Sequence, residues 1–176
     1  MKMIFIIIIW VLFTCTPNFA QEACSISKKE NKEVIKLFGD KQPVEPILLS
    51  HERESFSELI REGDCIFGLL QDGKVVGYLL STQAKGRFDY FDYSVLYSED
   101  LTVLGLLVTV YRSTHGAGIC QKKWLHQFVG YNGGKLTVGR EIDAISGATF
   151  STSSMVDDIQ RCQQLMVRVK EVPLIN

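Results

Sequence analysis

The sequence predicts an α+β fold in which an antiparallel sheet of two hairpins is packed with short helices. The first hairpin joins residues 65–71 to residues 74–82, two apolar runs separated by Asp72-Gly73. This dipeptide tolerates the positive φ angles of a two-residue turn, whose twist matches that of paired strands. A second pair of apolar runs, within residues 94–113, flanks Glu99-Asp100. Near the C-terminus the apolar spacing becomes that of a helix.

The chain before the first hairpin is expected to be helical with one extended connection. Residues 24–38 have an amphipathic pattern that ends at Gly39, a residue type that commonly terminates helices. Pro43 and Pro46 disfavour helical backbone before them, so the segment around them is expected to be extended. Residues 51–63 carry apolar side chains on one side and are predicted to form a second helix.

The second half of the chain is expected to hold the longest strand and the longest helix. Residues 101–113 are almost wholly apolar, which predicts a central strand covered on both faces. Residues 120–130 predict a short helix whose apolar side includes Trp124, a residue that we expect in the core. The apolar residues of the last helix recur at steps of four and three. They are Met155, Ile159, Cys162, Met166 and Val169.

The N-terminus has the pattern of a secretory signal. Met3–Phe13 is an unbroken apolar run, shorter than the roughly 20 residues that a membrane-spanning helix needs, and Ala20 is a suitable cleavage position. We expect a signal peptide or an uncleaved anchor over residues 1–20, an N-terminal helical segment over 21–63 and the main domain over 64–176. The protein is therefore expected to be exported, to the periplasm or the outer face of the cytoplasmic membrane.

Charge and histidine spacing exclude two classes of function. The chain has 19 Lys and Arg against 20 Asp and Glu, without the basic excess of nucleic-acid-binding proteins, so no nucleic-acid partner is expected. His51, His115 and His126 lie at no spacing typical of metal ligands, so no metal site is expected either.

The cysteines leave the disulfide state open. Four remain if the segment containing Cys15 is removed, and an exported protein can pair them. Four cysteines allow three pairings, among which the spacing does not choose. Cys65 and Cys162 lie on apolar faces, which favours buried thiols at these two positions. The other two are Cys24 and Cys120. The oligomeric state is likewise open.

Residues 143–154, DAISGATFSTSS, place small and hydroxyl side chains just before the last helix. One interpretation is helix capping, because Ser and Thr accept hydrogen bonds from the unpaired amides of a helix start. On this view the residues from Ser151 to Ser154 lie at the start of the helix, and Ser154 and Asp157 have the spacing of a capping box, with Asp in place of the usual Glu. Capping alone needs one hydroxyl and leaves the small residues of the segment without a role.

The second interpretation is that the segment binds a phosphate at the positive end of the helix dipole. Gly147 and Ala148 would let the backbone come close, while Thr149 and Ser151 would donate hydrogen bonds to phosphate oxygens. The dipole contributes only about 0.3–1 kcal/mol at an exposed site, too little to hold a soluble ligand after export. A covalent bond from a threonine hydroxyl to the phosphate would hold it permanently.

DAISGAT, residues 143–149, is similar to the flavinylation motif of the FMN-binding domain family. That family includes the C subunit of the sodium-translocating NADH:quinone oxidoreductase and the G subunit of the Rnf electron-transport complex. The resemblance covers about residues 64–170 and implies that an FMN transferase joins the phosphate of FMN to Thr149. The rest of the motif would form the recognition frame, and it comprises Asp143, Ser146, Gly147 and Ala148.

The resemblance also implies flavin contacts outside the motif. In the loop after the second hairpin, Gly116 and Gly118 would let the backbone approach the flat ring. His115 either contacts the isoalloxazine or is an ordinary loop histidine. Tyr90 and Tyr93 are candidates to stack on the flavin, although an aromatic near a strand is more often a core residue.

The resulting hypothesis is an exported electron carrier with FMN on Thr149, in which no residue acts as a catalytic acid or base. Such a protein is part of an oxidoreductase system rather than a stand-alone enzyme. Its expected partners are the FMN transferase and a redox protein, such as a membrane electron-transport complex. One alternative is a module that binds FMN without a covalent bond or serves in assembly. A hydrolase using Ser146 or Thr149 with His115 is disfavoured, because no GxSxG motif is present.

Overall fold

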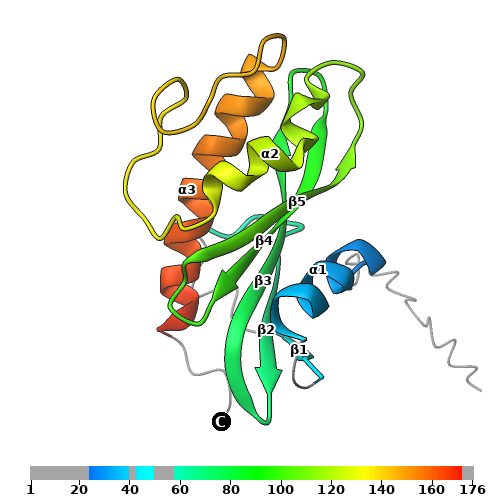
Figure 1. The fold of residues 1–176 in the computed structure, drawn as a ribbon, viewed down its shortest axis with the longest axis vertical. Helices are drawn as coiled ribbons and strands as arrows, with labels where there is room; N and C mark the ends of the chain where they lie inside the picture. Colours follow the sequence, from blue (N-terminus) through cyan, green and yellow to red (C-terminus); the bar gives the residue numbers. More distant parts are fainter. Residues whose placement is uncertain (1–23, 40–42, 50–57, 172–176) are drawn as a thin grey trace, which may run out of the picture.

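The computed structural model describes residues 24–39, 43–49 and 58–171. Within them, five antiparallel strands form one sheet whose spatial order follows the chain (Figure 1). The strands are β1 (Glu45–Leu48), β2 (Cys65–Gln71), β3 (Lys74–Lys85), β4 (Tyr90–Ser98) and β5 (Val103–Tyr111). The helices are α1 (Lys28–Phe38), η2 (Ala117–Cys120), α2 (Lys122–Leu125), η3 (His126–Phe128) and α3 (Thr149–Lys170). The predicted α+β class is confirmed.

Both predicted hairpins are present. At the β2–β3 turn, Asp72 and Gly73 have φ angles of +50° and +73°, and Gln71 pairs with Lys74, as a two-residue turn requires. Residues 99–102 connect β4 to β5. The extended connection around Pro46 is confirmed, and it also forms β1, a strand that the sequence did not predict. Pro46 is tolerated there because β1 lies at the edge of the sheet.

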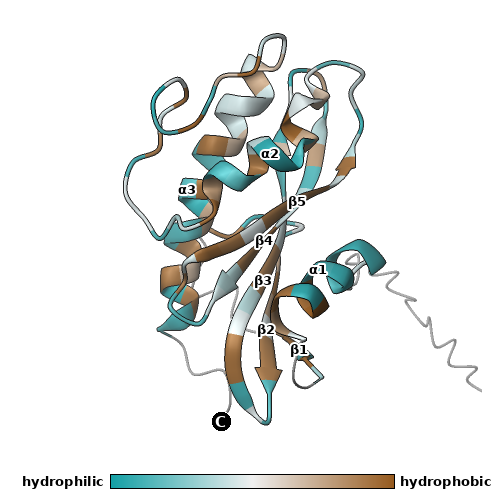
Figure 2. Cartoon of the chain, in the orientation of Figure 1, coloured by the Kyte–Doolittle hydropathy of each residue, from teal (hydrophilic) through white to brown (hydrophobic). Residues whose placement is uncertain are grey.

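Helices cover both faces of the sheet. On one face, α3 and α2 pack against the strands and enclose the larger apolar core, which includes Tyr93, Val95 and Tyr97 of β4. On the other face, α1 encloses a smaller cluster that includes Val34 and Leu96. Figure 2 shows hydrophobic residues concentrated on the strands, whereas α1 is mostly hydrophilic. The alternation along β4 assigns its residues to one core or the other.

The last helix is confirmed, and its five predicted apolar residues are all buried, at 0–2% exposure. Helix α1 is also confirmed with Gly39 at its C-terminal cap, although it begins only at Lys28, where Ser27 and Glu30 form a capping box. Trp124 is 5% exposed and lies in the core, as predicted.

Two local predictions were wrong. Strand β5 is an edge strand rather than a central one, because among the described strands β4 alone pairs with it. Helices do pack on both of its faces, as predicted. Residues 58–63 form turns rather than a helix, since Asp64 accepts a hydrogen bond from the Arg61 amide and closes this segment. The rest of that predicted helix lies outside the described residues. The short helix predicted within residues 120–130 is present as α2 and the 3-10 turn η3, which together span Lys122–Phe128.

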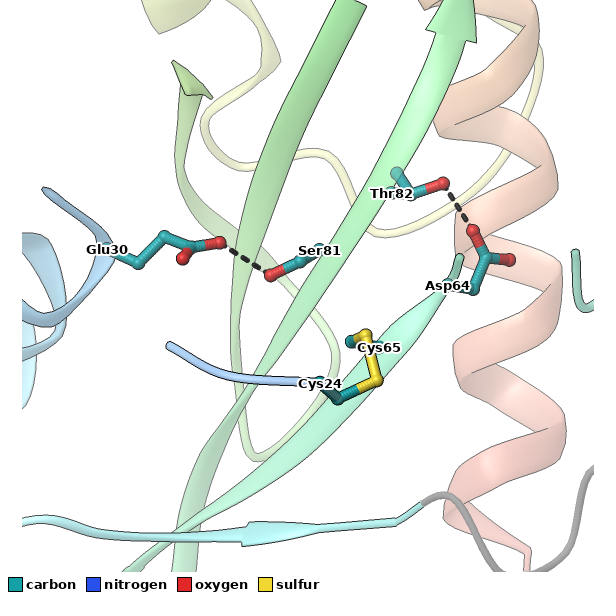
Figure 3. The surroundings of a disulfide bond; sticks show 6 residues. All are labelled: Cys24, Glu30, Asp64, Cys65, Ser81 and Thr82. Atoms are coloured by element: carbon teal, nitrogen blue, oxygen red, sulfur yellow. Dashed lines mark hydrogen bonds between the residues drawn. A yellow bond between two sulfur atoms is a disulfide. The ribbon is translucent and has the colours of Figure 1, made fainter. Parts of the chain in front are cut away.

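A disulfide joins Cys24 to Cys65, with the Cα atoms 5.7 Å apart (Figure 3). The expectation of a buried thiol at Cys65 was therefore wrong, because the start of β2 lies beside the segment that leads into α1. The buried thiol at Cys162 is confirmed, and Cys120 is free and exposed.

The predicted signal, residues 1–20, lies outside the described residues. In the described part of the chain, no helix combines the length and apolar character needed to cross a membrane. The same part contains no group of three or more His, Cys, Asp or Glu side chains arranged to hold a metal ion.

Candidate functional site

The N-terminus of α3 carries no side-chain cap. The helix begins at Thr149, and its N-cap residue Ala148 makes no side-chain hydrogen bond. The residues from Ser151 to Ser154 are helical, so the capping interpretation of these hydroxyls was wrong. The backbone amides of Thr149, Phe150 and Ser151 have no acceptor among the described residues. The positive end of the longest helix is therefore available to an anion.

The segment leading to this helix is held at its start by hydrogen bonds between its backbone and two side chains. The Trp124 indole Nε1 donates to the carbonyl of Asp143 (2.8 Å), and the amide of Asp143 donates to Gln127 Oε1 (2.9 Å). The side chains of Asp143, Ser146 and Thr149 are exposed. The first and last residues of the motif are thus exposed, and hydrogen bonds hold the backbone of Asp143, where the segment begins.

Gly147 has a φ angle of +76°, and a Cβ atom built on it would meet no atom within 4 Å. Its role is therefore to adopt a left-handed backbone that other residues rarely adopt, rather than to clear space. The amide of the next residue, Ala148, donates to the carbonyl of Ile145 (3.0 Å) and closes the turn into the helix.

The glycine-rich loop packs against the motif itself. A Cβ on Gly116 would lie 2.7 Å from Tyr111 Oη and 3.2 Å from Ser151 Oγ, and a Cβ on Gly118 would lie 2.7 Å from Ile145 Cγ2. Both glycines permit contact between protein segments. That they also let the backbone approach a flat ring stays a prediction.

Ser151 and His115 take part in the same packing. Ser151 is buried, and its Oγ lies 3.1 Å from Tyr111 Oη, which donates to the carbonyl of His115 (2.6 Å). Ser151 thus joins α3 to the loop and does not point at an exposed ligand. The imidazole of His115 is exposed, with Nδ1 3.0 Å from Thr114 Oγ1. In the described residues it forms no hydrogen bond with Ser146 or Thr149, so no hydrolase dyad is assembled.

Tyr93 does not belong to an exposed site. Its side chain is 0% exposed, and its hydroxyl donates to Asp158 Oδ2 (2.8 Å). The prediction that Tyr93 stacks on a flavin was wrong, because alternation along β4 directs it into the larger core. Burial also raises the pKa of Tyr93 well above its ordinary value. Tyr90, three residues earlier, is 51% exposed and lines an open hollow beside Thr149.

The hollow has a volume of about 820 Å³, within the range of small-molecule sites. It lies between the first turns of α3 and the β3–β4 connection. Its lining combines cations, an aromatic pair and hydroxyls, and comprises Arg61, Lys85, Gly86, Arg87, Tyr90, Thr149, Phe150, Ser153, Ser154, Asp157 and Asp158.

Exposed aromatic rings cluster around one cation at this hollow. The guanidinium of Arg87 lies 5.2 Å from the ring centroid of Phe88 and 5.7 Å from that of Phe150, within the range of cation–π contacts. These rings are 72% and 63% exposed, which is unusual for phenylalanine. The sequence offered no signal for this cluster, because Phe150 of α3 lies far in sequence from Arg87 and Phe88 of the β3–β4 connection.

A buried ionic network fixes the floor of the hollow. Arg161 donates to Asp158 Oδ1 and to Asp64 Oδ2 (both 2.7 Å), and Arg61 pairs with Asp158 at 2.5 Å. Burial alone would lower the pKa of Arg161, but its hydrogen bond to Asp158 and the neighbouring negative charges keep the pKa above its ordinary value. The network ties the turn before β2 to α3 directly beneath the site.

No protein-family model matches the chain, and no curated protein matches it. Among solved structures, the chain is similar to the crystal structure of NqrC from Shewanella oneidensis, with 16% sequence identity and a TM-score of 0.47. The match covers 80% of this chain and 90% of that one. At this identity and TM-score the similarity is a distant one of fold.

Proposed function

We propose that this protein is an exported flavoprotein electron carrier with FMN attached by a phosphoester bond to Thr149. The observation that carries the proposal is the position of Thr149. It is the acceptor position of the motif, and it lies exposed at the first turn of α3, beside the hollow and next to amides that have no acceptor in the described residues.

The residues around Thr149 fit the two ends of FMN. The amides of the first turn and the cations Lys85 and Arg87 would hold the phosphate, because both supply positive charge at an exposed surface. Tyr90 and Phe150 would pack against the flavin ring, as aromatic faces do with planar heterocycles. The bound flavin would supply one- or two-electron redox chemistry, while the protein supplies attachment and orientation.

Export is part of the proposal, and the disulfide between Cys24 and Cys65 supports it, because such bonds persist mainly outside the cytosol. The partners that it requires are an FMN transferase for maturation and a redox protein that exchanges electrons with the flavin. The exposed carboxylate of Asp143 is accessible to the transferase and is assigned to its recognition.

The test is to express the full chain with an FMN transferase in an exporting host. Flavin fluorescence is then followed on denaturing gels, and intact mass is measured. The chain should gain the mass of FMN less one water. Thr149→Ala should abolish the label. Ser153→Ala, in the same hollow and one turn later, should keep it.

Label that survives Thr149→Ala would place the attachment elsewhere and contradict the proposal. Flavin that co-purifies with the native chain but is lost completely on denaturation would instead support a non-covalent module. Asp143→Ala should reduce labelling without reducing the yield of folded protein. An equal loss of both would contradict its role in recognition.

A further inference from the structure

A second hollow follows the free edge of the sheet. It has a volume of about 530 Å³ and is lined by five consecutive residues of β5, Leu104–Val108. Helix α1 borders it on one side, and α2 with the residues after it borders the other. Successive side chains of a strand point to opposite faces, so a groove that contacts all five residues follows the main chain. We call it the β5 groove.

The main chain of β5 is open to pairing along this groove. The strand has β4 as its neighbour in the sheet and presents its other edge to the groove. At the start of the edge, Val103 exchanges hydrogen bonds with Gly130 and Tyr131 (both 2.8 Å). Apart from the hydrogen bonds with β4, the main chain of Leu104–Val108 has one hydrogen bond to the described residues. Lys29 Nζ donates it to the carbonyl of Val108 (2.5 Å).

The rim of the β5 groove is positively charged, although the net charge of the chain is −1. Lys29, Lys32, Lys36 and Lys122 line it, together with the single acid Glu33. Glu33 pairs with Lys36 at 2.9 Å. Within the described residues, the other three lysines form no ion pair, and the acceptor of Lys29 is a neutral carbonyl. Three ammonium groups therefore face the groove without a carboxylate.

We propose that the β5 groove binds an extended acidic segment of a partner protein, which adds a strand to the free edge of β5. Main-chain hydrogen bonds to Leu104–Val108 would supply affinity, as in other cases of strand addition. Carboxylates of the segment would pair with the lysines of the rim. Leu37 and Val129, which line the groove at 38% and 40% exposure, would accept its alternate apolar side chains.

Two other roles for the lysines lead to different observations. Lysines beside an edge strand also protect it from aggregation, in which case no peptide binds. An anionic membrane would pair with the lysines but would leave the N–H and C=O groups of the strand without partners. The open main chain at the bottom of the groove favours the peptide over the bilayer.

The test uses the full chain and a short synthetic peptide that alternates valine and glutamate. Binding is measured by calorimetry, and protection of Cys120 from alkylation is measured by peptide mapping, because this exposed thiol lines the groove. The double variant Lys32→Glu with Lys122→Glu should weaken binding about tenfold or more. The matched reversal of Lys74 and Lys135, which are exposed elsewhere, should leave binding unchanged.

A peptide methylated on alternate backbone nitrogens keeps its charges but cannot pair as a strand. It should therefore not bind the groove and should not protect Cys120 from alkylation. Equal binding of the methylated peptide would overturn strand addition. Absence of peptide binding would also overturn the proposal, and so would equal effects of the two charge reversals. Binding to phosphatidylserine vesicles in place of the peptide would assign the lysines to a membrane surface instead.

Discussion

Ser81 and Thr82 are neighbours on β3, yet their side chains point to opposite faces of the sheet (Figure 3). Ser81 donates to Glu30 of α1 (2.6 Å), on the face with the small apolar cluster. Thr82 donates to Asp64, whose partner Arg161 belongs to α3, on the face with the large cluster. Each face therefore has a buried carboxylate that links its covering helix to the sheet.

The two faces differ in what else stabilises them. The α3 face buries the apolar side of a long helix and adds an internal ionic network of balanced charge. The α1 face has a short, mostly hydrophilic helix, and it is reinforced by the Cys24–Cys65 disulfide. A face that buries little apolar area needs covalent and charge-assisted links, as small domains do. The candidate flavin site lies on the α3 face, where the large apolar core and the ionic network hold the helix without a disulfide.

The largest effect is expected from the ionic network of the α3 face. Arg161→Met should lower the free energy of unfolding by about 5 kcal/mol, the upper end for breaking a buried ion pair, because it leaves Asp64 and Asp158 without their shared cation. Denaturant unfolding monitored by circular dichroism measures the change.

The matched control is Arg168→Met, on the same helix. Arg168 is exposed and pairs with Glu171 at 3.5 Å, so its loss should change stability by less than about 1 kcal/mol. Similar losses for both variants would show that the buried network has no special part in this face.

The next effect is expected from the disulfide of the α1 face. Replacing Cys24 and Cys65 together by serine should cost about 4 kcal/mol, since the bond closes a loop with a sequence separation of 41 residues in the unfolded chain. Adding a reductant should lower the stability of the wild type to that of the double variant and leave the variant unchanged. A loss below about 1 kcal/mol would mean that α1 needs no covalent link.

A smaller effect is expected when the same change, valine to alanine, is made in each of the two cores. Val156 of α3 and Val34 of α1 are buried to 2% and 3% exposure. Val156→Ala should cost about 2 kcal/mol, because the large core leaves a cavity, whereas Val34→Ala should cost about 1 kcal/mol, because a short helix can shift to fill the space. Equal losses in urea unfolding would contradict the idea that the two faces differ in rigidity.

Sequence periodicity predicted the elements whose signals are local. The turn at Asp72-Gly73 and the apolar stripe from Met155 to Val169 depend on neighbouring residues alone, and both are confirmed. The position of β5 was wrong because an apolar strand covered by helices resembles a central strand in sequence. Nothing local indicated that Cys24 and Cys65 would meet across 41 residues.

The site shows the same limit. The motif gave Thr149 as the candidate acceptor, and the structure brings this residue to an exposed helix start. The motif could not indicate which residues surround Thr149, because Arg87, Tyr90 and Phe150 meet only through the packing of α3 on the sheet. The sequence indicated Tyr90 and Tyr93 alike, since the alternation of side chains along a strand assigns residues to faces only once the register of the strand is known.

The smallest effect is expected from the protonation of Glu30, the carboxylate of the α1 face. Burial alone would raise its pKa, but hydrogen bonds from Ser27, Ser81 and Ser94 outweigh burial and hold the pKa below its ordinary value of 4.5. Ser81 and Ser94 are cross-strand partners, so one carboxylate links β3 and β4 to the helix. Its contribution is therefore fully present above pH 4.5 and is lost as the pH falls through the lower folded-state pKa.

Glu30→Gln removes the titrating group and keeps a similar shape, so its stability should depend less on pH than that of the wild type in this acidic range. The measurement is the urea midpoint from neutral pH to about pH 3 for both proteins. Parallel profiles would exclude Glu30 as the source of the acid sensitivity. A convergence of the two profiles at low pH would identify this carboxylate as a pH-dependent link between α1 and the sheet.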